Sequence, residues 1–339
     1  MQYDIAVIGN DEAAVEMMCL AAKSGKRTAA LLPESTHSAW LVGLALKRLI
    51  LDLLADQTVC RRQLLARTGS PRLLRQLIAG AIVRETEELA CTLEHLKIHI
   101  CMGQPRFIDR NSVSVADGRT CNRTSLSADH FVIGTGARYT AMHRPLGLIE
   151  LHRPESMFEG TILPRSVCLL GGDSFGCGMA ALFSLFGVQS RYVAHDGQDS
   201  AMLELAYAAG VEITFHLSEC GSMRSGGVLS NSHADVVDCR RTVGFTEYLN
   251  LSSIDVEADE NGRLWCSSGF ETWCRGVYGI GDVVGFSADS TLHPSVQAER
   301  IHRRISPQVP RPRIMDLFVN TEEQHGVPLQ RPASDVLNN

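Results

Sequence analysis

The chain has 339 residues, which is long for one hydrophobic core and predicts two domains. Hydrophobic residues make up 45% and charged residues 21%, values typical of a globular protein and not of a disordered or fibrous one. The net charge of −6 excludes a generally basic, polyanion-binding surface.

The sequence shows no sign of export or membrane insertion. The longest apolar stretch starts at Trp40 and runs into Lys47 and Arg48, so we expect no bilayer span. The first residues lead directly into a strand pattern without a basic leader. Eleven cysteines are scattered singly and form no CxxC pair, as is typical of reduced thiols. We therefore predict a cytoplasmic protein.

A strand–turn–helix–strand unit occupies the first residues. The apolar run 5–8 ends at Gly9, helical spacing of apolar residues covers 11–24, Gly25 ends the helix, and a second apolar run starts at Thr28. Parallel strands joined by a helix have both faces covered, which suits uniformly apolar strands. The order and size predict a dinucleotide-binding unit.

The same unit returns later in the chain. The apolar run 167–170 ends at Gly171, and a helix-like stretch then reaches Gly187. Gly9 and Gly171 are 162 positions apart, as are Gly25 and Gly187, so the unit is an internal repeat. Two such units favour a protein with two nucleotides over a dehydrogenase with one cofactor.

Further elements are predicted between and after the repeats. Residues 38–67 and 71–96 have the composition of long helices, and residues 130–136 form an apolar strand that ends in Gly-Thr-Gly. Short strands are predicted within 97–120, 211–215, 235–238 and 277–281, and residues 306–339 are expected to be a polar tail.

Four sequence stretches occur in the order and near the spacing of a known family: YDIAVIGNDEAAVEMMCLAAKSGK from Tyr3, ADHFVIGTGAR from Ala128, VCLLGGDSFGCGMAALFSLFGV from Val167, and GVYGIGDVVGF from Gly276. A fifth, weaker match covers 241–262. Over residues 3–300 the chain resembles the pyridine nucleotide–disulfide oxidoreductases, closest to their soluble NAD(P) transhydrogenase and dihydrolipoamide dehydrogenase branches. The resemblance implies an α/β fold with two Rossmann-like dinucleotide-binding domains, the second inserted in the first.

The resemblance also implies that each domain binds a different cofactor. Residues 1–150 plus 270–305 would bind FAD, and residues 151–269 would bind NAD(P). Hydride would pass between NAD(P)H and the flavin, to an electron acceptor that the sequence does not name. The alternative is a catalytically degenerate member with weak or no flavin binding, which acts as a binding or regulatory protein. Neither nucleic acid nor a membrane is expected as a partner.

Residues that match the family's motifs form the candidate site. The resemblance assigns no catalytic residue and no metal ligand. In the family, the carboxylate that matches Asp282 accepts a ribityl hydroxyl of the flavin, and a carboxylate after the second strand contacts a ribose. The FAD side is expected to include Gly9, Asp11, Ala14, Glu34, Thr135, Gly136, Gly281 and Asp282, and the NAD(P) side Gly171, Asp173, Gly176 and His195.

Both glycine turns depart from the motif at their second position. A glycine there lets the backbone approach the diphosphate, but this chain has Asp11 and Asp173 instead. Each carboxylate would repel a diphosphate. Aspartate is also among the best helix N-caps, so Asp11 is predicted to accept hydrogen bonds from the amides of Ala13 or Ala14. Self-capping and phosphate binding therefore remain two alternatives.

Other departures affect the expected chemistry. No cysteine lies between Cys19 and Cys60, so the redox CxxxxC of the family's disulfide enzymes is missing, and we expect no match to the family's C-terminal interface domain. Glu34 lies one position beyond the expected ribose contact, so it is either that contact or a solvated loop carboxylate. His95 and His99 have a metal-ligand spacing without a third ligand, and we interpret them as ordinary surface or core histidines.

Overall fold

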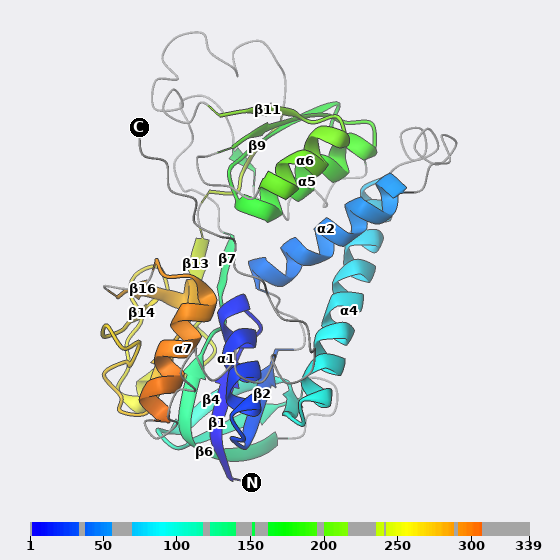
Figure 1. The fold of residues 1–339 in the computed structure, drawn as a ribbon. Coiled ribbons are helices and arrows are strands. Elements are labelled where there is room, and N and C mark those ends of the chain that lie inside the picture. The colour runs from blue at the N-terminus through cyan, green and yellow to red at the C-terminus, as the bar shows by residue number, and fades with distance from the viewer. Residues whose placement is uncertain are drawn as a thin grey trace, which may run out of the picture.

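The structure is a computed structural model that describes residues 2–33, 38–55, 70–117, 123–139, 151–152, 162–194, 200–215, 235–240, 242–287 and 291–306. Figure 1 shows two lobes, each built on its own sheet, with helix α2 (Ala39–Ala55) crossing between them. The expected α/β class with two Rossmann-like units is confirmed.

The first lobe is built on a seven-stranded sheet with the order β3-β2-β1-β6-β5-β4, and β15 pairs with the last part of β6. Five of its strands are mutually parallel, and β4 and β5 form an antiparallel hairpin. Their bounds are β1 (Gln2–Ile8), β2 (Thr28–Leu32), β3 (His99–Met102), β4 (Gln104–Asp109), β5 (Ser112–Ala116), β6 (Arg123–Ile133) and β15 (Val277–Gly279).

Helix α1 (Glu12–Lys23) covers this sheet with its apolar side. Its small and flexible residues Ala13, Ala14, Met17, Met18 and Ala21 are all buried, because the helical period places them on one face. Gly25 adopts a positive φ of 81°, as expected of a glycine that ends a helix. Helix α7 (Pro294–Ile305) packs beside α1, as Figure 1 shows.

The second lobe is built on a five-stranded parallel sheet with the order β11-β10-β9-β12-β8. Helices α5 (Asp173–Leu185) and α6 (Ser200–Ala208) lie on it. The second strand–helix–strand repeat is thus present where the spacing predicted it. The strands are β8 (Leu151–His152), β9 (Ser166–Leu170), β10 (Gln189–Val193), β11 (Glu212–Thr214) and β12 (Asp235–Asp238).

Helix α2 belongs to the core of the second lobe, although its sequence follows the first repeat. Leu46 and Ile50 of α2 are fully buried in the same cluster as α5 and the β9 strand. A Cβ on Gly178 would lie 3.0 Å from the Cβ of Leu46, so the two helices approach closely because α5 has a glycine there. Helix α4 (Pro71–His95) packs against α2 and begins at Ser70, whose hydroxyl accepts the Leu73 amide hydrogen at 3.2 Å.

The chain returns to the first lobe after β12. Strands β7 (Ala137–Tyr139) and β13 (Thr242–Gly244) form an antiparallel pair that joins the lobes, followed by the short helix η3 (Leu251–Ile254). This segment adds Leu249, Leu251, Ile254, Val256, Leu264 and Cys266 to the first core. Strands β14 (Leu264–Trp265) and β16 (Val284–Phe286) pair with each other. The exact domain limits at 150 and 270 remain a prediction.

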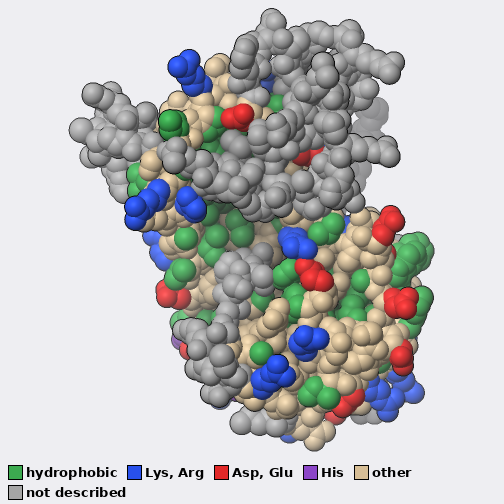
Figure 2. Space-filling model, turned by 180° about the vertical axis from the view of Figure 1, so that it is seen from behind, with side chains coloured by type: hydrophobic (Ala, Val, Ile, Leu, Met, Phe, Trp, Pro, Cys, Tyr) green, Lys and Arg blue, Asp and Glu red, His purple; other side chains and the backbone are tan. Residues whose placement is uncertain are grey.

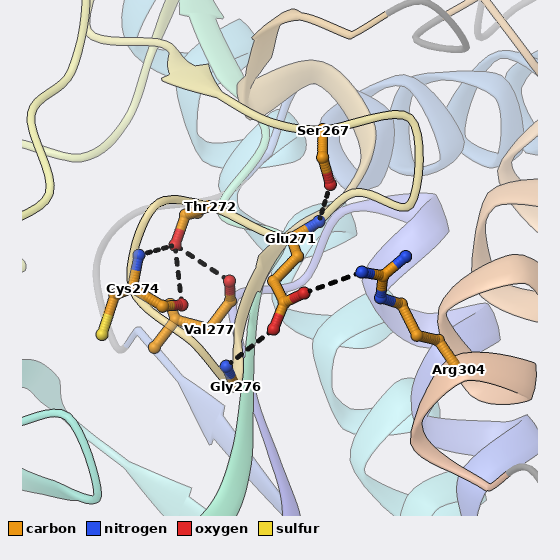
Figure 3. Close-up of polar contacts among 7 residues, drawn as sticks. All are labelled: Ser267, Glu271, Thr272, Cys274, Gly276, Val277 and Arg304. Atoms are coloured by element: carbon orange, nitrogen blue, oxygen red, sulfur yellow. Dashed lines mark hydrogen bonds and ion pairs between the residues drawn. The ribbon is translucent and has the colours of Figure 1, made fainter.

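A hydrogen-bonded loop carries the chain into β15. Glu271 accepts the Gly276 amide hydrogen at 3.0 Å and forms an ion pair with Arg304 of α7 at 3.1 Å. Its own amide donates to Ser267, and the Thr272 hydroxyl bonds to the Val277 carbonyl at 2.9 Å (Figure 3). These contacts fix the start of β15 and therefore the place of the helical turn η4 (Gly281–Val283) that follows it.

The surface agrees with the modest net charge. Figure 2 shows acidic and basic side chains interspersed over the lower lobe on that face, without one strongly basic area. Within the described ranges, none of the helices has the length and apolar character that a membrane crossing requires.

Candidate functional site

A cleft lies where the carboxyl ends of both sheets meet. It consists of two cavities of about 370 and 450 Å³, and Ala39, Tyr139, Asp173, Gly281 and Asp282 line both. Parallel α/β sheets bind ligands outside the carboxyl ends of their strands, so this cleft is the expected place for a site. The two glycine turns approach it from opposite sheets.

The first turn is closely packed against the end of β6. Gly9 has a φ of 112°, and a Cβ there would lie within 3 Å of three backbone atoms of Gly134 and Thr135. Ala14 stands at the third glycine position, and its methyl group is accommodated because Gly134 has no side chain. The turn therefore keeps its backbone shape despite two substitutions in the motif.

The Asp11 side chain does not cap its own helix, so the self-capping prediction for Asp11 is wrong. Asp11 is the N-cap residue of α1 with φ −72° and ψ 158°, but its carboxylate accepts no hydrogen bond from the first turn in the capping geometry. It accepts instead the amide hydrogen of Asp282, at 3.2 Å. The side chain is 4% exposed and lies against Gly136 and Gly281.

Two carboxyl groups, those of Asp11 and Asp282, lie close together at the first turn. Burial, and after it the nearby charge of Asp282, raise the pKa of Asp11 from 3.8 to about 7, although hydrogen bonds from backbone amides oppose the shift. Burial also raises the pKa of Asp282, whereas the positive charge of Arg263 lowers it. No basic side chain in the described part of the chain forms an ion pair with Asp11.

The second turn has the same backbone outline but a different side-chain arrangement. Gly171 and Gly172 have positive φ values of 60° and 86°, and Asp173 follows with 45°, which is unusual for a residue with a side chain. Asp173 is exposed on the cleft surface, so its carboxylate does not fill the turn. Gly176 packs against the Gly171 carbonyl, where any Cβ would clash.

Two residues that the sequence reasoning missed shape the second turn. Arg240 lines the cleft beside Gly171 and is held by Asp238 through contacts of 2.9 and 3.0 Å. The Tyr139 hydroxyl donates to the Gly172 carbonyl at 3.0 Å, and its ring stacks on Phe175 at 4.5 Å. Asp238 lies two positions before Arg240, at the end of a predicted strand, and this spacing was the available sequence signal for the Asp238–Arg240 ion pair.

The remaining candidates fall into three groups. Glu34 and His195 lie outside the described residues. Thr135 is buried, and its hydroxyl has no hydrogen-bond partner among the described atoms. The structure brings Asp11, Gly136 and the Gly281–Asp282 pair together.

The two histidines with metal-ligand spacing have separate partners. His95 contacts the Cys91 carbonyl at 2.7 Å, and His99 contacts the Tyr3 hydroxyl at 2.5 Å. Among the described residues no group of side chains has the composition of a metal site.

The fold and the paired glycine turns are those of a protein with two dinucleotide-binding units, and the family comparison agrees. The family model described as pyridine nucleotide-disulphide oxidoreductase matches residues 3–306, so the chain belongs to this family. The prediction of the family is confirmed.

Individual relatives are similar at low identity. The soluble pyridine nucleotide transhydrogenase of Marinomonas sp. (strain MWYL1) is 27% identical over 329 residues, which cover 84% of this chain and 67% of the relative. That of Pseudomonas fluorescens (strain Pf0-1) is 25% identical over 337 residues, with coverage of 86% and 68%. The chain thus spans about two thirds of their length.

A solved structure shares the fold. The HOCl-induced flavoprotein disulfide reductase RclA from Escherichia coli superposes with a TM-score of 0.54 at 16% identity, over 91% of this chain and 72% of that one. A second structure of RclA, a Cu(II) complex, gives a TM-score of 0.55 at 18% identity.

Family membership confirms FAD and NAD(P) as the cofactor class, and the two turns fit these groups unequally. At the second turn the glycine backbone and the start of α5 face the cleft beside Arg240, which suits a diphosphate. At the first turn the buried Asp11 carboxylate lies between the start of α1 and Gly281. In this conformation the first turn does not fit a diphosphate.

Proposed function

We propose that the protein is a nicotinamide nucleotide-dependent oxidoreductase that binds NAD(P) at its second glycine turn. The observation that supports this most is the open second turn, which faces the same cleft as Asp282. The names of the transhydrogenase relatives support hydride transfer between nicotinamide nucleotides as the type of reaction. The electron acceptor is not identified by any residue of the cleft.

The second turn offers three features that a diphosphate needs. Gly171 and Gly172 allow the backbone to come close, and the amides at the start of α5 carry the positive end of the helix dipole. The planar Arg240 side chain is oriented by a two-contact pairing with Asp238, which is 1% exposed. Asp173 opposes the binding of an anion, but its exposure to solvent weakens this repulsion.

A second candidate function rests on Asp11. Because this carboxylate is buried in the first turn, the chain also fits a binding or regulatory protein with weak or no flavin affinity. Such a protein would still bind a nicotinamide nucleotide at the second turn. We place it in the cytoplasm, in keeping with the soluble transhydrogenases it resembles.

Nucleotide titrations test the proposal. NADH and NADPH binding is measured by fluorescence for the wild type, for Arg240→Gln, and for Arg191→Gln as a control. Arg191 is also an arginine paired with an acid, but its ion pair with Glu212 joins the neighbouring strands β10 and β11. We expect Arg240→Gln to weaken binding at least tenfold, about 1.4 kcal/mol, and the control to leave it unchanged. Absence of nucleotide binding in the wild type would refute both candidate functions.

Flavin reduction separates the two candidates. The visible spectrum is followed after NADPH is added to the protein with an excess of FAD. Bleaching of the flavin faster than in a protein-free mixture supports the oxidoreductase. Tight NADPH binding without such bleaching supports the binding or regulatory protein instead.

A further inference from the structure

The buried carboxylate of Asp11 has an unusual set of neighbours for an N-cap residue. Its backbone amide donates to the Gly134 carbonyl at 3.3 Å, and its side chain reaches across to the amide of Asp282, 271 positions later in the sequence. Thus one residue connects the start of α1 to the ends of both β6 and β15. A capping role alone needs none of these contacts.

The glycines around Asp11 mark the space that its side chain fills. A Cβ on Gly136 would lie 3.3 Å from both the Cβ and the Cγ of Asp11, and a Cβ on Gly281 would clash with its Oδ2. Both glycines have positive φ values, 69° and 74°. The carboxylate therefore occupies a cradle of bare backbone, which is the arrangement by which a glycine turn receives an anion.

The group in this cradle has the chemistry of a phosphate oxygen. It is an oxygen acid that accepts a backbone amide hydrogen, that of Asp282 in the turn η4, as a phosphate oxygen can. The second turn provides the contrast, because Asp173 stands at the same motif position but is exposed. Only the first turn contains an acid of its own inside the cradle.

We propose that the Asp11 carboxyl group occupies the diphosphate place of the first turn, so that FAD binds only by displacing it. This inference concerns the flavin side and rests on the proposed function only in taking FAD as the dinucleotide in question. Flavin affinity is then set by competition between the Asp11 carboxyl group and the diphosphate for the place against Gly136, Gly281 and the Asp282 amide. Asp11 acts as a residue that determines affinity and not as a catalytic one.

The test compares ligands with and without the diphosphate. FAD and riboflavin are titrated by fluorescence quenching against the wild type, Asp11→Gly, Asp11→Asn and the control Asp173→Gly. We expect Asp11→Gly to bind FAD at least tenfold more tightly than the wild type, about 1.4 kcal/mol, with riboflavin binding unchanged. Asp11→Asn keeps the side-chain volume without the charge, so its gain should be smaller. Asp173→Gly should leave FAD binding unchanged.

The outcomes separate this inference from the proposed function. Equal or weaker FAD binding by both Asp11 variants, in proteins with wild-type circular dichroism, would overturn the inference. So would an equal gain for riboflavin, because a ligand without a diphosphate does not compete with Asp11. Should Asp11→Gly fail to fold, Asp11→Asn alone decides between gain and no gain. NADPH titration of the same proteins reports on the second turn. If the wild type does not bind NADPH, the proposed function is refuted, whereas the FAD result still decides the inference about Asp11.

Discussion

The two glycine turns of this protein share a backbone outline and differ in where one carboxylate points. In the first turn Asp11 is buried and bonded to the amide of Asp282, whereas in the second turn Asp173 is exposed on the cleft. The difference follows from the surroundings, because the first turn is backed by two strand ends with glycines that leave room for a side chain. The same substitution of glycine by aspartate thus buries the carboxylate in one turn and exposes it in the other. The packing around the turn, and not the motif itself, determines which occurs.

A large expected effect concerns the third motif position, where the turns also differ. Gly176→Ala would push a methyl group into the Gly171 carbonyl, so we expect a loss of about 3 kcal/mol in the free energy of unfolding. Ala14→Gly should cost only about 1 kcal/mol, since it adds backbone entropy to the unfolded chain without a clash. Urea unfolding measures both. Similar losses for the two variants would show that the second turn relaxes more easily than its packing indicates.

The next prediction concerns the contribution of Asp11 to the pH dependence of stability. The Asp11 pKa is raised from 3.8 to about 7 in the folded protein, so the folded state holds a proton that the unfolded state has released. Stability should therefore fall as the pH rises from about 4 to about 7 and change little above that. Asp11→Asn should reduce this fall by up to about 4 kcal/mol, at 1.36 kcal/mol per pKa unit. The check is urea unfolding at pH 5 and pH 8.

The exposed aspartate provides the control for this pH experiment. Asp173→Asn leaves the buried Asp11 in place, so it should show the same fall in stability as the wild type. A flat wild-type profile between pH 4 and 7 would mean that water reaches Asp11 in solution.

A smaller effect is expected from the contact that supports the second turn. Tyr139→Phe removes the hydrogen bond to the Gly172 carbonyl and should lower stability by about 1 kcal/mol. Burial raises the pKa of Tyr139 well above its ordinary value, so the effect should not change between pH 6 and 9. Thermal unfolding measures the loss. Tyr207→Phe is the matched control, since Tyr207 is 77% exposed, and an equal loss there would assign the effect to the substitution type.

The smallest expected effect is the response of ligand binding to salt. Asp173→Asn should strengthen NADPH binding by about threefold at low ionic strength and by less at 0.5 M salt, because exposed charges are screened. The gain in FAD affinity of Asp11→Asn should persist at high salt, since the charge it removes is buried. Titrations at two salt concentrations compare the turns directly. Equal screening of both effects would contradict the difference in burial.

Much of the fold was predictable because local patterns determine it. The uniformly apolar runs that end at Gly9 and Gly171 are buried parallel strands, and the two repeat units, 162 positions apart, form two separate sheets. The helix predicted from 71 to 96 is α4. These features depend on residues that are near one another in the sequence.

The candidate site was less predictable because it depends on distant contacts. Asp11 was expected to bond to amides two or three positions away, but its partner Asp282 follows β15 at the far end of the fold. Sequence spacing does not report such a pairing. Arg240 was missed for a related reason, since its importance comes from lying beside Gly171, which is 69 positions earlier.

Helix α2 has a consequence for how the molecule can be divided. Its apolar side completes the core around α5, although it is encoded between the two halves of the first sheet. A fragment that begins at β8 would therefore expose the side of α5 that Leu46 and Ile50 cover, and it would tend to aggregate. The lobes resemble two domains in outline, but the core of the second is completed by a helix whose sequence lies between strands of the first.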